Sequence, residues 1–272
     1  MNEIHLKVFC FPITLKCNLR CKLCGANSPY YASPYHPSID DLFDQLDALF
    51  RLVSYIDKFD IGGGEPFLRD DLASIIANIR LRYRSQIGRI RIITNGTMYP
   101  MDDQKHNVCF MEEARKWGED FYIIIDKYSV RQDISGKIHL LLCREKIPHE
   151  VRDYANDLHC GGWVDFGDFS RKCDGEGAKK LFQKCSVPRQ GFFTSIVDGK
   201  LFPCGRARIL YEKGIGKDYV DLRDRTLSDK LKKQKFLDML GAEYLETCGY
   251  CNGMCDDSER FLPAEQLSAK GK

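Results

Sequence analysis

The stretch CNLRCKLC, residues 17–24, places three cysteines in a C-x3-C-x2-C pattern just after a predicted strand at residues 6–14. Three thiolates on one short loop can hold three irons of a cubane cluster, which leaves the fourth iron without a protein ligand. Structural zinc normally takes four ligands, and no nearby histidine completes a set of four here. Asn18, Arg20 and Lys22 make the loop polar, so packing alone does not explain it. The stretch therefore predicts an iron–sulfur site with an open iron.

Strands and helices alternate along the first half of the chain. Hydrophobic periodicity predicts strands at 6–14, 58–61, 89–93, 121–126 and 150–154, and helices at 38–56, 72–83, 109–117 and 136–145. Ser38 is a plausible N-cap of the first helix. This order indicates βαβ units and a parallel sheet, so the fold class is α/β. In a sheet that curves into a barrel, the chemistry lies at the carboxyl ends of the strands.

The cysteine stretch resembles the signature of the radical S-adenosylmethionine (SAM) superfamily. That family carries C-x3-C-x2-C after the first strand of a partial (β/α)6 barrel, and Cys17, Cys21 and Cys24 match it position for position. The resemblance implies a [4Fe-4S] cluster on these cysteines that gives one electron to bound SAM, from a donor such as flavodoxin or ferredoxin. Cleavage of SAM then yields a 5′-deoxyadenosyl radical, which removes a hydrogen atom from the substrate.

A second segment resembles the GGEP motif of the same family. Gly63, Gly64, Glu65 and Pro66 follow the second predicted strand. In the family this motif holds the amino group of SAM's methionine. Glycines allow close backbone approach, and a carboxylate suits an ammonium group.

Two further positions bear on SAM binding. Thr94 and Asn95, followed by a glycine, end the third predicted strand and resemble the family's TNG segment, where the barrel rim approaches SAM; a plain Asn-Gly turn is the alternative. Leu23 stands where many members have an aromatic residue that contacts the adenine edge. This departure weakens stacking and leaves cluster ligation intact.

The second half of the chain is rich in glycine, cysteine and aspartate. A β-hairpin is predicted at 192–203 around Asp198 and Gly199, and a helix at 227–240. We therefore expect two domains, a radical SAM partial barrel at 1–159 and a small cysteine-rich domain at 160–272.

A second group of cysteines lies in this region. The group predicts a four-thiolate site for zinc or for an iron–sulfur cluster, and its members are Cys185, Cys204, Cys248, Cys251 and Cys255. The C-x9-15-G-x4-C opening resembles the SPASM and twitch auxiliary-cluster domains of radical SAM enzymes. Because the full seven-cysteine pattern is absent, the resemblance implies one auxiliary [4Fe-4S] cluster, on the first four cysteines, with Cys255 competing with Cys248. This layout is most similar to the 2-deoxy-scyllo-inosamine dehydrogenase family.

Other candidate residues have simpler explanations. Asp126 and Tyr128 follow the most apolar strand; a substrate contact or proton relay is one interpretation, and a helix cap or loop position is favoured. Residues 159–163, HCGGW, fit a bend with a core tryptophan. The five remaining cysteines are predicted to be packing residues, with the two at the domain junction left open: Cys10, Cys109, Cys143, Cys160 and Cys173.

Composition restricts location and partners. Thirteen cysteines in 272 residues are an odd count in a chain too long for a disulfide scaffold. Pro12 breaks the short N-terminal apolar run, and no segment approaches the ~20 apolar residues of a membrane span. A cytoplasmic protein with reduced thiols is therefore expected, without membrane contact. The net charge of +2 gives no basic field for nucleic acid.

Three functions follow from these observations. The favoured function is oxidation of a small polyol, sugar or aminocyclitol. The alternative is modification of a ribosomally made peptide, which the mere 16 residues before Cys17 disfavour because a leader-recognition domain needs more. The non-enzyme alternative is a zinc-stabilised binding protein.

Overall fold

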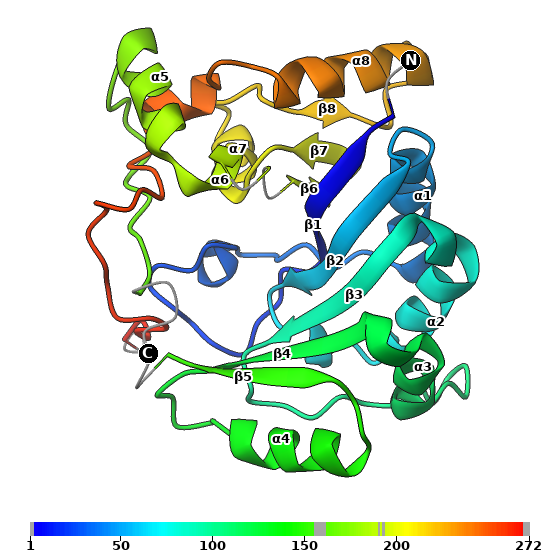
Figure 1. Cartoon of the computed structure of the whole chain (residues 1–272). Helices are drawn as coiled ribbons and strands as arrows, with labels where there is room; N and C mark the ends of the chain where they lie inside the picture. The colour runs from blue at the N-terminus through cyan, green and yellow to red at the C-terminus, as the bar shows by residue number, and fades with distance from the viewer. Residues whose placement is uncertain (1–2, 155–161, 190, 192–193, 269–272) are drawn as a thin grey trace.

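A single mixed sheet of eight strands forms the centre of the molecule, in the order β5-β4-β3-β2-β1-β6-β7-β8. The computed structural model describes residues 3–154, 162–189, 191 and 194–268. Figure 1 shows the helices of the first half along the outer side of the curved sheet, while long loops, the helices at 175–189 and the C-terminal segment lie toward the opposite side.

The first five strands of this sheet are all parallel and alternate with helices. The strands are β1 (His5–Thr14), β2 (Tyr55–Gly63), β3 (Ile87–Thr94), β4 (Phe121–Lys127) and β5 (His149–Asp153), and the helices are α1 (Ile39–Phe50), α2 (Leu72–Tyr83), α3 (Phe110–Trp117) and α4 (Ser135–Arg144). The predicted α/β class and the alternation are confirmed. The described residues give five consecutive barrel strands, one fewer than the (β/α)6 pattern of the family.

The second half of the chain extends this sheet beyond β1. Strand β6 (Thr194–Val197) pairs with β1 in parallel, and β7 (Lys200–Phe202) and β8 (Val220–Asp221) continue antiparallel. The predicted hairpin is confirmed at its turn, where Asp198 and Gly199 both have positive φ (50° and 71°), as a two-residue primed turn requires. The domain boundary at residue 160 stays a prediction.

The described residues of the second half form four α-helices. They are α5 (Gly175–Lys184), α6 (Ser186–Arg189), α7 (Gly205–Glu212) and α8 (Asp229–Leu240), and a 3-10 segment, η6 (Glu246–Tyr250), follows them. Only α8 was predicted, and it begins after its N-cap Ser228, whose Oγ accepts a hydrogen bond from the Leu231 amide. The sequence pattern missed α5, α6 and α7.

The predicted helix at 38–56 was too long. Its start is confirmed, since the Ser38 Oγ accepts a hydrogen bond from the Asp41 amide at 3.1 Å. The helix ends at Phe50, because Tyr55 and Ile56 pair with the start of β1 and belong to β2. Strand pairing therefore overrides the continuing helical pattern of apolar residues.

The core fills the space between the parallel strands and their covering helices. Phe9, Phe59 and Phe121 are fully buried on β1, β2 and β4, and Leu46 and Ile76 are fully buried on α1 and α2. This packing fixes the carboxyl ends of the strands, where the first cysteine group lies.

Candidate functional site

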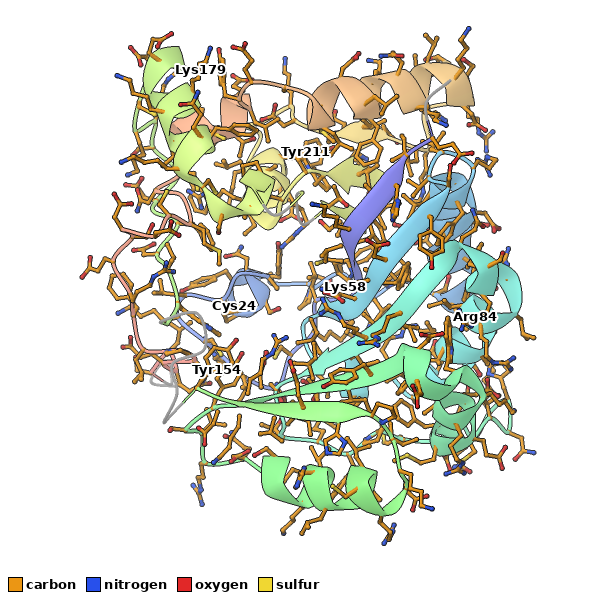
Figure 2. All side chains as sticks on the ribbon, viewed as in Figure 1. Cys24, Lys58, Arg84, Tyr154, Lys179 and Tyr211 are labelled. Carbon is orange, nitrogen blue, oxygen red and sulfur yellow. The ribbon has the colours of Figure 1, made fainter. Side chains whose placement is uncertain are left out.

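The first three cysteines line one cavity at the carboxyl ends of the barrel strands. Cys17, Cys21 and Cys24 share this cavity of about 240 Å³ with the glycines that end β2. In Figure 2, Cys24 lies on the loop beside the edge where β5 leads into Tyr154. The three thiols therefore lie at the carboxyl-terminal edge of the parallel strands, where such sheets place their chemistry.

Burial keeps two of these thiols neutral without a metal. It raises the pKa of Cys17 to about 12 and that of Cys21 to about 11, and the neighbouring thiols add to the effect. A buried thiolate is therefore costly in free energy unless a positive charge lies beside it. A bound metal ion provides that charge and takes the place of the thiol proton, so these cysteines suit a cationic group.

Hydrogen-bond donors point at two of the sulfur atoms. The Leu19 amide lies 3.4 Å from the Cys17 Sγ, and the Asn95 side-chain amide lies 3.7 Å from it. The Gln266 Nε2 donates to the Cys21 Sγ at 3.3 Å. Such donors stabilise thiolates and tune the potential of a cluster that they hold.

Gln266 belongs to a segment near the C-terminus that the sequence did not connect with the site. The Lys22 amide donates a hydrogen bond to the Glu265 carbonyl, and the Leu267 amide donates one to the Arg20 carbonyl, both at 2.8 Å. This segment therefore runs alongside the cysteine loop. About 240 residues separate the two segments, and no local pattern in the sequence could have indicated the pairing.

The glycine motif packs closely against the backbone of residues 14–16, which lead into the cysteine loop. The Gly64 amide donates to the Thr14 carbonyl at 2.7 Å, and the Glu65 amide donates to the Lys16 carbonyl at 2.9 Å. A Cβ atom at Gly64 would lie 1.9 Å from the Lys16 carbonyl oxygen, and Gly63 has φ +110°. Only glycine fits these two positions.

Glu65 does not line the cavity, although its fit to an ammonium group was the expected reason for the motif. Its side chain is fully buried and accepts hydrogen bonds from the Phe67 amide, the Thr94 hydroxyl and the Asn95 amide, at 3.0, 2.8 and 2.8 Å. Burial raises its pKa to about 7 despite these donors. Glu65 thus holds the ends of β2 and β3 together, while the glycine backbone faces the cavity. Pro66 is buried and starts a short 3-10 turn.

Leu23 lines a second, larger cavity and is absent from the lining of the first. Its contact with the adenine edge of SAM stays a prediction. Thr94 and Asn95 do line the first cavity, in agreement with the prediction for the third strand.

Asp126 gives the first cavity an unsatisfied acceptor. It lies in β4, lines the cavity, and its Oδ1 is buried without a hydrogen-bond partner among the described residues. Its Oδ2 accepts from the Tyr128 hydroxyl at 3.3 Å, and burial raises its pKa to about 7. This geometry favours the ligand-contact interpretation over a helix cap.

The second cavity, of about 590 Å³, lies between α5, α7 and η6. Four of the five C-terminal cysteines line it, namely Cys185, Cys204, Cys248 and Cys251, and Cys255 does not. Burial raises the pKa of Cys204 and Cys248 to about 12 and that of Cys251 to about 11. Backbone amides donate to two sulfurs, from Ala207 to Cys204 at 3.5 Å and from Gly253 to Cys251 at 3.3 Å.

The two cavities meet at the cysteine loop. Cys24 and Gly25 line both. A Cβ atom at Gly205, next to Cys204, would lie 3.5 Å from the Gly25 carbonyl oxygen. The two cysteine groups, far apart in the sequence, therefore face neighbouring spaces.

The donor sets fit iron–sulfur clusters. A tetrahedral zinc ion on four thiolates is compact and leaves little space among its ligands. Here four thiols line the large second cavity together, and Cys17, Cys21 and Cys24 share the first cavity with Cys10 of β1. A bulky group with its own sulfide ions suits both arrangements.

The other cysteines differ in their surroundings. Cys10 lines the first cavity, and Cys109 and Cys173 are half-buried. Cys143 is exposed, so its predicted packing role is wrong: it lies on the solvent side of α4. Cys160 and His159 lie outside the described residues, and Trp163 is half-buried at the first cavity.

Comparisons with known proteins relate the first half of the chain to one superfamily. Residues 11–128 match the model of the Radical SAM superfamily. A probable GTP 3',8-cyclase of Methanococcus aeolicus is 32% identical over 108 residues, which are 39% of this chain and 36% of that protein. A 7,8-dihydro-6-hydroxymethylpterin dimethyltransferase of Methanocaldococcus jannaschii is 30% identical over 138 residues, 50% of this chain and 25% of that protein. The chain thus spans about a third or less of these relatives.

Two solved structures share the fold. BtrN in complex with AdoMet and 2-DOIA has a TM-score of 0.56 at 16% identity, covering 98% of this chain and 100% of that chain. Native anSMEcpe with bound AdoMet has a TM-score of 0.53 at 13% identity, covering 93% and 88%.

The match over residues 11–128 supports a radical SAM enzyme. This superfamily implies a SAM-binding [4Fe-4S] cluster and SAM as cofactors, and both structural neighbours hold AdoMet. Among the described residues, no helix is long and apolar enough to cross a membrane.

Proposed function

We propose that this enzyme oxidises a small polar molecule, a polyol, sugar or aminocyclitol, with the help of one auxiliary [4Fe-4S] cluster. The observation that carries the proposal is the pair of adjoining cavities, each lined by its own cysteines and sharing Cys24 and Gly25. An enzyme that oxidises by hydrogen abstraction needs a second electron acceptor close to the first site, and this arrangement provides room for one.

Cys17, Cys21 and Cys24 would hold the SAM-binding cluster. When bound and reduced, this cluster supplies the electron that cleaves SAM to the radical that abstracts hydrogen. The amide donors from Leu19 and Gln266 would stabilise the thiolates. The backbone hydrogen bonds between the cysteine loop and the C-terminal segment would keep these three cysteines at the first cavity.

The residues around this cavity would hold SAM. The backbone of Gly63 and Gly64 would accept the ammonium group, since Glu65 is committed to three protein donors. Asn95 would line the same space from β3. The buried, unpaired Asp126 Oδ1 would accept a hydrogen bond from a hydroxyl of SAM or of the substrate.

Cys185, Cys204, Cys248 and Cys251 would hold the auxiliary cluster. The absence of Cys255 from the cavity lining favours this set. Arg206 lines the same cavity and is buried, with its Nε unpaired among the described atoms. Its cation would offset the negative charge of a thiolate-bound cluster.

The substrate class rests on the relatives. The names of the sequence relatives, GTP cyclases and a pterin dimethyltransferase, are those of enzymes of small molecules. The BtrN neighbour is bound to 2-DOIA, which agrees with an aminocyclitol.

The test measures where hydrogen is taken from. Anaerobically reconstituted enzyme is incubated with SAM, a reductant and deuterated polyols, sugars or aminocyclitols. Transfer of deuterium into 5′-deoxyadenosine with one of these classes supports the proposal. Deuterium transfer only from a labelled peptide would instead support the peptide-modifying function, and zinc without iron in the purified protein would support the binding-protein function.

A further inference from the structure

A cluster of two histidines and one cysteine lies outside both cavities. His139 and Cys143 stand four residues apart on α4, so they share one face of the helix, and His149 is the first residue of β5. The His139 Nδ1 lies 2.9 Å from the His149 Nε2, and the Cys143 Sγ lies 3.9 and 3.8 Å from these two atoms. The Cys143 Sγ also lies 3.8 Å from the His139 Nε2, and one potential ligand atom from each residue lies within 4.8 Å of the other two.

The size of this triangle suits a transition-metal ion. A point equidistant from the three atoms would lie about 2.1 Å from each, which matches the zinc–nitrogen bond of ~2.0–2.1 Å and is slightly shorter than the zinc–sulfur bond of ~2.3 Å. Tetrahedral bonds of these lengths need the two nitrogens to move apart by roughly 0.4 Å and the sulfur to move slightly closer to them. No large rearrangement of α4 is needed.

A second-shell contact prepares one histidine for this role. The His149 Nδ1 lies 2.7 Å from the Ile147 carbonyl oxygen, which can only accept a hydrogen bond. The proton of a neutral ring is therefore on Nδ1, and the lone pair of Nε2 points at the other two ligands. Metal-binding histidines commonly have this arrangement.

The geometry points to a zinc site on His139, Cys143 and His149, with water in the fourth position. Two imidazoles and one thiolate suit zinc better than magnesium or calcium, which prefer oxygen ligands. His149 starts β5, so the site lies at the amino ends of the parallel strands, away from the cysteine loop. A metal here joins α4 to β5 and stabilises the edge of the sheet without entering the reaction.

The experiment measures zinc on cluster-loaded protein. The reconstituted enzyme is exposed to Zn²⁺, freed of unbound metal, and analysed for zinc and iron. We expect about one zinc ion per chain beyond the iron, and less than about a tenth of that in Cys143→Ser and His149→Asn. Cys109→Ser, which changes a cysteine outside this cluster and both cavity linings, should keep the full zinc content. Equal iron in all variants shows that they are folded and loaded.

Zinc K-edge X-ray absorption identifies the ligands. The proposal predicts two nitrogens, one sulfur and one oxygen around zinc. Four sulfur ligands, or zinc retained in Cys143→Ser, would overturn it, because the zinc would then lie on another cysteine group. A wild-type zinc content no higher than that of Cys143→Ser would also overturn it, and the 2.9 Å contact would then be a plain hydrogen bond between the histidines.

Discussion

Gln266 and Cys21 lie 245 positions apart in the sequence, and the Gln266 Nε2 donates a hydrogen bond to the Cys21 Sγ at 3.3 Å. The contact is part of a short antiparallel bridge between the two residues. The C-terminal segment therefore reaches a sulfur that we assign to the SAM-binding cluster, and it can influence the electron affinity of that cluster.

Removal of this donor should make the cluster harder to reduce. A hydrogen bond of this kind stabilises the site by about 0.5–1.5 kcal/mol. For a one-electron couple, about 1.4 kcal/mol corresponds to about 59 mV. Gln266→Ala should therefore lower the midpoint potential of the cluster by roughly 20–60 mV. A redox titration monitored by EPR spectroscopy measures this midpoint potential. Glu265→Ala, which removes only an exposed ion pair with Lys22, is the matched control. Equal midpoint potentials in both variants would show that the Gln266 hydrogen bond does not affect the cluster.

Two glycines of the same loop should respond differently to alanine. A Cβ atom at Gly64 meets the Lys16 carbonyl oxygen, whereas one at Gly62 meets no atom within 4 Å. We expect Gly64→Ala to lower the free energy of unfolding by about 1–3 kcal/mol or more and Gly62→Ala to change it by less than about 0.5 kcal/mol. Chemical denaturation measures the free energy of unfolding of both variants. Equal values would show that the loop relaxes around the new Cβ atom.

Asp126 should make the stability of the protein depend on pH. Burial raises its pKa to about 7 in the folded state, so the folded protein holds this proton more tightly than the unfolded chain does. The stability contribution is complete below the unfolded pKa of ~3.9 and is lost as the pH rises through about 7, by an amount on the order of a few kcal/mol.

The check for Asp126 compares the wild type with Asp126→Asn between pH 5.5 and 8. The free energy of unfolding should fall less with rising pH in the variant. A residual slope should remain, because burial also raises the pKa of Glu65 to about 7. Identical pH profiles would mean that Asp126 has an ordinary pKa.

The fourth auxiliary ligand can be decided by a pair of alanine variants. Cys248 lines the second cavity and Cys255 does not. Cys248→Ala should lose about four irons per chain, and Cys255→Ala should retain them. Iron and sulfide analysis after reconstitution measures both. The reverse result would assign the position to Cys255.

The sequence predicted those features that depend on local pattern. Strand and helix periodicity gave the alternation of β1 to β5, and Asp198-Gly199 gave the hairpin turn. Cysteine spacing gave both candidate cluster sites. These signals are short in range, so they do not need the tertiary structure.

Features that depend on long-range contacts could not be predicted. The Glu65 side chain is buried because it accepts hydrogen bonds from the Thr94 hydroxyl and the Asn95 amide at the end of β3. Leu23 lines the second cavity because the second half of the chain packs against the cysteine loop. The contact of Gln266 has no local signal at all. The H-x3-C-x5-H spacing of His139, Cys143 and His149 was visible in the sequence, and only the structure shows that a helix and a strand close it into one cluster.

The central claim is that the N-terminal cysteines hold the cluster that cleaves SAM. The most direct measurement is 5′-deoxyadenosine formation by the Cys17→Ala, Cys21→Ala, Cys24→Ala triple variant, together with its iron content. We expect the wild type to carry about eight irons per chain and the variant about four, with no reductive cleavage of SAM by the variant. Undiminished 5′-deoxyadenosine formation by the variant would contradict the account.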